Sequence, residues 1–266
     1  MAYYSGMEQR PFFLVTNDDG VHSPGLHALA DELAKLGDVL IIAPAVERSG
    51  FSQAITLMTP FRVERVDERT FSVDGTPADC VVYGLFHELK GRRPDWVVSG
   101  INRGANLGND TLYSGTVGAA MEAACNGFKA MAVSLVTEQR GAELHFATAA
   151  HVAARILARP GAGEAARGRV INVNVPNRPL DQVVGVQVAE LSQRHYDKSL
   201  RVENRPDGRL FCSYGGGPVT HDGKPGNDSY AVDQGFASVT LLKPSMLDAD
   251  GNQALKRLWD EGRTRD

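Results

Sequence analysis

Residues 12–20 read Phe12-Phe13-Leu14-Val15-Thr16-Asn17-Asp18-Asp19-Gly20. The apolar run is continuous, partly aromatic and β-branched, and polar turn formers end it, so it predicts a short buried strand. Two adjacent carboxylates, Asp18 and Asp19, follow that strand directly, and their burial is costly unless a cation or a proton neutralises them. This stretch alone fits two interpretations equally. One is a site for a hard divalent metal such as Mg²⁺ or Mn²⁺. The other is a turn whose carboxylates lie in solvent or cap the next helix.

The residues that follow indicate an α/β fold, a Rossmann-like sheet flanked by helices. Leucines recur at helical spacing over 25–36, Gly37 ends that helix, and 39–43 is a second apolar run that ends at Pro44. This strand-helix-strand order is typical of a parallel sheet. Alternating residues within 55–73 predict antiparallel strands beside it. Further along, helices are expected at 76–89, 116–126 and 145–157, strands at 96–99, 130–135 and 170–175, and a Gly-rich loop at 100–115.

Beyond about residue 180 the pattern changes. Strands are expected at 183–191, 209–213 and 236–242, with a turn at 206–208, a loop at 215–228 and a final helix at 252–261. We therefore divide the chain into a Rossmann-like domain at 1–180 and a strand-rich C-terminal extension at 181–266. The boundary is approximate, and a single domain is the alternative.

The composition is typical of a soluble globular protein and argues against a nucleic-acid-binding or membrane protein. The 266 residues are 42% hydrophobic and 23% charged, and the net charge is −4, which argues against a nucleic-acid-binding surface. No apolar run approaches the ~18 residues of a membrane helix, and residues 1–10 lack the apolar stretch of a signal peptide. The three cysteines, Cys80, Cys125 and Cys212, are widely spaced and form no C-x-x-C pair. This pattern fits reduced thiols, so we expect a cytoplasmic protein.

Three loops after predicted strands could share one metal, because the carboxyl ends of parallel strands meet at one edge of the sheet. They span 17–20, 43–52 and 99–108, and they offer carboxylates, hydroxyls and amides. Such donors make an incomplete oxygen shell that leaves positions for water and a phosphate oxygen. Ser114, Gly115 and Thr116 directly precede a helix, where free backbone N–H groups can bind an anion. Simple helix capping is the more common role of such residues. The sequence has neither a Walker P-loop nor a G-x-G-x-x-G motif after a strand.

Several ordered motifs resemble one known family, the stationary-phase survival proteins or SurE-type nucleotidases. They include Val15-Thr16-Asn17-Asp18-Asp19-Gly20, Val73-Asp74-Gly75-Thr76-Pro77, Ser99-Gly100-Ile101-Asn102-Arg103-Gly104-Ala105-Asn106 and Tyr113-Ser114-Gly115-Thr116-Val117-Gly118. The resemblance is strong over residues 11–136 and weaker afterwards. It implies a metal-dependent phosphomonoesterase that acts on nucleoside 5′- or 3′-monophosphates, and a homodimer or homotetramer assembled through the C-terminal segment.

The resemblance also implies roles for individual residues. Asp18, Asp19, Ser49 and Asn102 match the family's ligands for one divalent metal per subunit, Mg²⁺ or Mn²⁺. The two aspartates are the expected catalytic residues. Asn106, Ser114, Gly115 and Thr116 match its phosphate-contacting loop. We expect a metal-activated water to attack the phosphoester in line, because no Cys or His stands in a recognisable phosphatase motif.

Two other classes use acidic residues after a first strand. A phospho-receiver signalling module needs a lone acceptor Asp after a middle strand, yet the predicted strands end at Pro44 and Gly100. A haloacid-dehalogenase-type phosphatase uses Asp-x-Asp, and Asp18-Asp19 lacks the intervening residue. His22, His27 and His221 are weak candidates for substrate contact, and none is assigned as the general acid.

Overall fold

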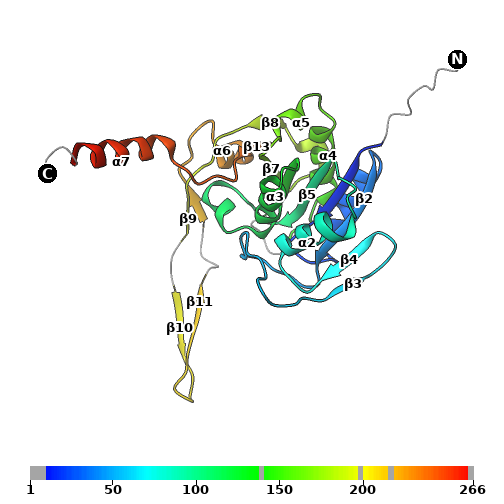
Figure 1. Ribbon diagram of the computed structural model, residues 1–266, viewed down its shortest axis with the longest axis horizontal. Helices are drawn as coiled ribbons and strands as arrows, with labels where there is room; N and C mark the ends of the chain where they lie inside the picture. The colour runs from blue at the N-terminus through cyan, green and yellow to red at the C-terminus, as the bar shows by residue number, and fades with distance from the viewer. Residues whose placement is uncertain (1–9, 138–140, 197–199, 215–218, 263–266) are drawn as a thin grey trace.

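The computed structural model describes residues 10–137, 141–196, 200–214 and 219–262. Nine strands form one sheet in the order β3-β4-β2-β1-β5-β6-β7-β13-β8 (Figure 1). From β4 to β7 neighbouring strands are parallel, whereas β3 and β13 run antiparallel to β4 and β7. The strands are β1 (Phe12–Thr16), β2 (Asp38–Pro44), β3 (Val63–Arg65), β4 (Thr70–Val73), β5 (Trp96–Arg103), β6 (Ala130–Val136), β7 (Val170–Pro176), β8 (Gly185–Val188) and β13 (Phe236–Leu242).

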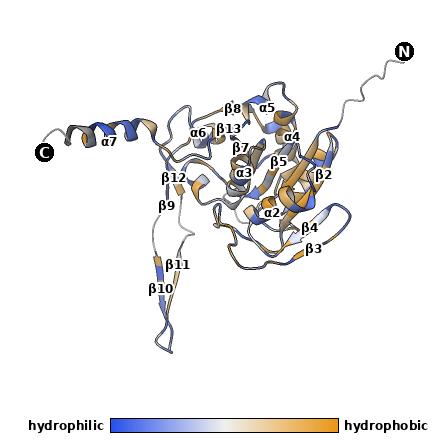
Figure 2. Cartoon of the chain, in the orientation of Figure 1, coloured by the Kyte–Doolittle hydropathy of each residue, from blue (hydrophilic) through white to orange (hydrophobic). Residues whose placement is uncertain are grey.

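Helices cover both faces of this sheet because side chains alternate along each strand. Phe13 and Val15 of β1 pack in the core beneath α1 and α4, while Phe12 and Leu14 pack in the core beneath α2 and α3. The central strands are predominantly hydrophobic (Figure 2). The described helices and helical turns are α1 (Pro24–Ala34), α2 (Pro77–Tyr83), η1 (Gly84–Glu88), η2 (Gly108–Leu112), α3 (Gly115–Cys125), α4 (Phe146–Leu157), α5 (Ala162–Ala165), η3 (Leu180–Gln182), α6 (Asp228–Asp233) and α7 (Ala249–Gly262).

The C-terminal part both extends the sheet and protrudes from it. Strands β13 and β8 continue the main sheet beyond β7. Two smaller antiparallel pairs join β9 (Arg194–Tyr196) with β12 (Val219–His221) and β10 (Leu200–Asn204) with β11 (Leu210–Tyr214). The β10–β11 hairpin and α7 stand clear of the body of the molecule (Figure 1).

The expected α/β fold is confirmed, and most predicted helices and strands are present within a few residues. The turn at 206–208 is confirmed, since Arg205 N donates to the carbonyl of Arg209 at 2.9 Å within the β10–β11 hairpin. Antiparallel pairing within 55–73 is confirmed for β3 and β4, although β4 itself lies parallel to β2 in the main sheet. Within the described residues, no helix is long and apolar enough to span a bilayer. Most of the segment 1–10, where we saw no signal peptide, lies outside the described residues.

Two predicted loops were wrong in part. The loop expected at 100–115 begins as strand, because β5 continues to Arg103 through an irregularity between Ser99 and Asn102. Its end contains the turn η2. The loop expected at 215–228 contains β12 within its described residues. In both places glycine suggested a loop, whereas pairing with a distant strand held the backbone extended.

Candidate active site

Asp18 and Asp19 lie at the carboxyl end of β1, which pairs with β2 and β5 in the interior of the parallel sheet. Asn17 holds the turn that follows: its side-chain amide donates to the carbonyl of Gly20 at 3.0 Å and to Ser23 Oγ at 2.6 Å. Ser23 is the N-cap of α1. The loop that carries both carboxylates is therefore tied to the next helix.

Asp18 is buried, with 3% of its surface exposed. Thr116 Oγ1 donates a hydrogen bond to Asp18 Oδ1, and Arg48 N donates to the Asp18 carbonyl at 2.7 Å. A Cβ on Gly115 would lie 2.9 Å from Asp18 Cβ, so helix α3 begins directly against this carboxylate. Burial raises the pKa of Asp18 to about 6, and the neighbouring Asp19 carboxylate adds to the rise while the Thr116 hydrogen bond opposes it.

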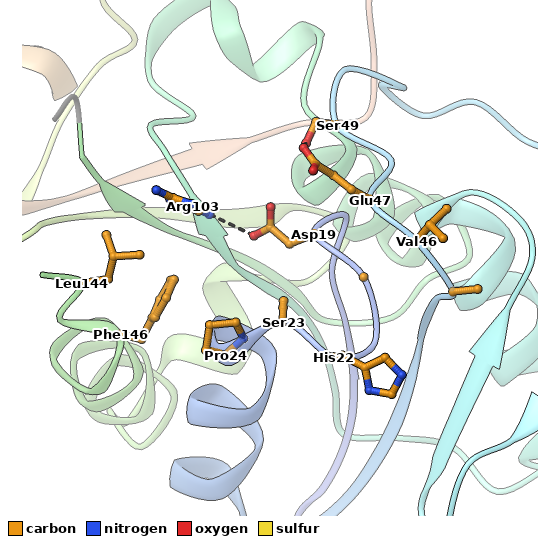
Figure 3. A pocket seen from close by; sticks show the side chains of 12 residues that line it. Asp19, His22, Ser23, Pro24, Val46, Glu47, Ser49, Arg103, Leu144 and Phe146 are labelled. Carbon is orange, nitrogen blue, oxygen red and sulfur yellow. Dashed lines mark hydrogen bonds between the residues drawn. The ribbon is translucent and has the colours of Figure 1, made fainter. Parts of the chain in front are cut away.

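Asp19 faces a cavity of about 450 Å³ (Figure 3). Its Oδ2 accepts a hydrogen bond from Arg103 N at 3.0 Å, the dashed line in Figure 3. Glu47 and Ser49, from the loop after β2, line the same cavity, and Ser49 Oγ donates to Glu47 Oε1 at 2.9 Å. Desolvation raises the pKa of Asp19, and the charge of Glu47 raises it further. Three acidic or hydroxyl groups therefore meet at one wall.

A second cavity of about 650 Å³ brings most of the predicted site residues together. It is lined by Asp18, Ser49, Asn102, Asn106 and Ser114, among others. Ser49 and Arg103 line both cavities, so the two adjoin. Gly115 and Thr116 lie behind Asp18 rather than on the wall of either cavity.

Asn106 is fixed by polar side chains that project from neighbouring strands. Its backbone N donates to Asn174 Oδ1 at 2.8 Å, and its side-chain amide donates to Ser134 Oγ at 2.8 Å. The amides of Asn172 and Asn174 both donate to its carbonyl, at 2.9 and 3.0 Å. Because the backbone and the amide nitrogen of Asn106 are held within the protein, its position in the cavity wall is well defined.

Ser114 has the capping role that its place before a helix predicts. Its Oγ accepts a hydrogen bond from Val117 N at 3.0 Å. A hydroxyl that accepts one hydrogen bond can still donate its own proton. The positive end of the α3 dipole lies here, beside the cavity and next to Asp18. Capping and anion binding are therefore compatible at this helix N-terminus.

The donor set suits a divalent cation that prefers oxygen ligands. Among the described residues, neither Asp18 nor Asp19 forms an ion pair with Lys or Arg, although both are substantially buried. No group of three or more His, Cys, Asp or Glu able to hold a metal occurs in the described part of the chain. Mg²⁺ is commonly bound by one or two carboxylates, and neutral oxygens and water complete its coordination shell. Ser49 and Asn102, which line the cavity with Asp18, offer such oxygens.

Several residues at the two cavities were not singled out from the sequence. They are Glu47, Arg103, Asn109, Asp110, Asn172, Asn174, Arg194, His195 and Tyr196. Only Asn172 and Asn174 carry a detectable signal, since two asparagines alternate within an otherwise apolar strand. Of the histidines weighed, His22 lines the smaller cavity. His27 is exposed on α1, and His221 Nε2 lies 2.8 Å from Asp233 Oδ2, away from both cavities.

Comparisons with known proteins agree with this geometry. The family model described as survival protein SurE matches residues 13–198. A 5′-nucleotidase SurE of Vibrio cholerae serotype O1 is 41% identical over 245 residues, 92% of this chain and 95% of the relative. A protein of the same name from Geobacter metallireducens is 43% identical over 93% of this chain and 96% of its own length. The crystal structure of the SurE protein from Aquifex aeolicus superposes with a TM-score of 0.81 at 33% identity. That match covers 93% of this chain and 99% of the solved one.

Proposed function

The chain belongs to the survival protein SurE family, and we propose that it is a 5′-nucleotidase that hydrolyses nucleoside monophosphates to nucleoside and phosphate. The observation that carries the proposal is the Asp18–Asp19 pair at the carboxyl end of a central parallel strand, where Asp18 is buried and Asp19 is half-buried. The N-terminus of α3 and a 650 Å³ cavity adjoin this pair, so an anion and a cation can be bound together.

We propose that Asp18, Asp19, Ser49 and Asn102 hold one divalent cation, Mg²⁺ or Mn²⁺. Such a cation neutralises charge on the phosphoryl oxygens and lowers the pKa of a bound water. Thr116 orients the Asp18 carboxylate through its hydroxyl, and Arg103 N orients Asp19. Asn106 and Ser114, which line the larger cavity, form the phosphate site together with the N-terminus of α3, where Gly115 and Thr116 begin the helix. In this arrangement the protein supplies fixed dipoles and charges rather than a covalent nucleophile.

The test is phosphate release from AMP by full-length protein with Mg²⁺ or Mn²⁺, before and after chelation. Asp18→Asn and Asp19→Asn should each lower turnover by at least about 100-fold, since loss of a ligand carboxylate costs several kcal/mol of transition-state stabilisation. Asp31→Asn, the same change at an exposed position of α1, is the matched control. Full activity in chelator, or near-normal turnover in both site variants, would contradict the proposal.

The segments beyond residue 180 are proposed to mediate assembly into a homodimer or homotetramer. Their exposed apolar side chains support this: Leu258 and Trp259 on α7 are 68% and 74% exposed, and Leu210 on the hairpin is 64% exposed.

Cys80, Cys125 and Cys212 are free, which supports the proposal that the protein works in the reducing cytoplasm.

A further inference from the structure

One wall of the larger cavity is built by strand β9, from the C-terminal part of the chain, together with turn η2, which lies between Asn106 and Ser114 in sequence. Strand β9 contributes Arg194, His195 and Tyr196 to it, and turn η2 contributes Asn109 and Asp110. Arg194 N donates to Asn109 Oδ1 at 2.7 Å, which fixes β9 against η2. Strand β9, distant in sequence, thus completes a cavity that Asp18, Asn106 and Ser114 also line.

Arg194 and Asp110 on this wall are largely buried, whereas Tyr196 is partly exposed, and polar contacts join the three side chains. The Arg194 and Asp110 side chains are 8% and 12% exposed, and Arg194 Nε lies 3.0 Å from Asp110 Oδ2. The Tyr196 hydroxyl donates to the same Oδ2. Burial, followed by this hydrogen bond, raises the pKa of Tyr196 to about 12, so the hydroxyl keeps its proton. Asp110 is therefore positioned from two sides.

This cluster retains hydrogen-bonding capacity. Arg194 Nε is buried and, within the described residues, lacks a hydrogen bond of good geometry despite its short distance to Asp110. A guanidinium has five N–H donors and a carboxylate has two acceptor oxygens. Among the described residues, the contact between Arg194 and Asp110 joins Nε of the arginine to Oδ2 of the aspartate, and Tyr196 donates to that same Oδ2. Because the pair lines a cavity and keeps unused donors and acceptors, this wall can bind a polar ligand.

The charges on the wall indicate which part of a nucleotide lies there. The guanidinium and the carboxylate cancel, so the wall has donors and acceptors but little net charge. A second phosphate would need a net positive site, whereas a ribose hydroxyl both donates and accepts. Carboxylates recognise the ribose 2′-hydroxyl in dinucleotide-binding proteins for this reason.

We infer that Asp110 and Arg194 form the subsite for the ribose of the substrate, with Asp110 accepting a hydrogen bond from the 2′-hydroxyl and Tyr196 positioning Asp110. The inference rests on the proposed nucleotidase function and adds to it a preference for ribonucleotides. The cavity that joins this wall to Asp18 and Ser114 has a volume of about 650 Å³, within the usual range for small-molecule sites.

The experiment compares kcat/KM for AMP, 2′-deoxy-AMP and phenyl phosphate, all with Mg²⁺. Wild-type protein should prefer AMP over 2′-deoxy-AMP by about tenfold or more, the worth of a hydrogen bond to a charged group. Asp110→Asn and Tyr196→Phe should reduce this preference to below about threefold, and the loss should fall on KM for AMP more than on kcat. Asp207→Asn makes the same acid-to-amide change in the exposed pair with Arg209 on the β10–β11 hairpin, and it should keep the wild-type preference.

The outcomes distinguish a ribose subsite from a structural role of these residues and from failure of the nucleotidase function. Equal use of AMP and 2′-deoxy-AMP by wild-type protein overturns the ribose subsite, as does an unchanged preference in both variants. Equal loss on all three substrates shows a merely structural role and also overturns it. Hydrolysis of phenyl phosphate but of neither nucleotide would instead refute the nucleotidase function itself, and the subsite with it.

Discussion

At the scale of single residues, the site depends on carboxylates placed where they are unfavourable for the metal-free protein. Asp18 is 3% exposed and adjoins a second carboxylate, and its pKa is raised to about 6. A core residue of that size would ordinarily be apolar. We propose that a bound cation offsets this cost, because two poorly solvated carboxylates attract a cation more strongly than fully solvated ones would. Stability and function are therefore in opposition at this position.

Gly115 is the residue whose substitution tests this close packing most simply. A Cβ there would lie 2.9 Å from Asp18 Cβ and 3.0 Å from Asp18 Oδ2. Gly115→Ala should displace the carboxylate, lower kcat/KM for AMP by at least about tenfold, and cost about 1–3 kcal/mol in stability through overpacking. Steady-state kinetics and thermal unfolding measure the two effects. Gly163→Ala is the control, because its Cβ would meet only the flexible end of Lys129. Wild-type activity in Gly115→Ala would show that the contact relaxes without consequence.

At the scale of elements, the sequence revealed what is local and missed what depends on pairing between distant segments. The strand before Asp18 and the helix after Ser114 could be predicted because their apolar pattern and their caps lie within a few residues. The position of Asn102 within β5 could not, because Gly100 has a φ of +140° and sits against the carbonyl of Val133 in an irregular part of the strand. Such irregularities redirect side chains near active sites. Strand β9 was missed because its three residues gain their conformation by pairing with β12.

A prediction at this scale concerns strand β7, because its residue Asn174 supports the loop that carries Asn106. Asn174→Leu keeps the branched shape of the side chain but leaves the buried Asn106 N–H without its 2.8 Å acceptor. The loss should be about 1–3 kcal/mol of stability, together with at least about a tenfold fall in kcat/KM for AMP as the loop shifts. Ser238→Ala is the matched control on the neighbouring strand. Ser238 pairs in register with Asn174, and its buried Oγ has no hydrogen-bond partner among the described residues. Chemical denaturation that finds both variants equally stable would contradict the support role.

At the scale of the whole molecule, the C-terminal part is divided between the main body and two protruding elements. Strands β8 and β13 complete the main sheet, and β9 lines the larger cavity, so much of this part belongs to the main body. The β10–β11 hairpin and α7 stand clear of it (Figure 1). Helix α7 carries hydrophilic and hydrophobic residues along its length (Figure 2). A protruding hairpin and a lone amphipathic helix are marginal in water without a surface to pack on. Large exposed apolar patches of this kind mark association surfaces.

We therefore expect the apolar side of α7 to hold two or more subunits together. Leu255 and Trp259, one turn apart and 63% and 74% exposed, should become buried in the assembly. Replacing both with Glu should shift the sedimentation profile toward the monomer, because burying two carboxylates at an apolar contact is strongly unfavourable. Gln253→Glu with Arg257→Glu adds two glutamates at the same spacing on the other side of the helix, and this control variant should sediment as the wild-type protein does.

A wild-type protein that sediments as a monomer at micromolar concentration would rule out the assembly. If instead the two double variants behave alike, the contact lies elsewhere on the extension, and the β10–β11 hairpin with its exposed Leu210 becomes the surface to change next.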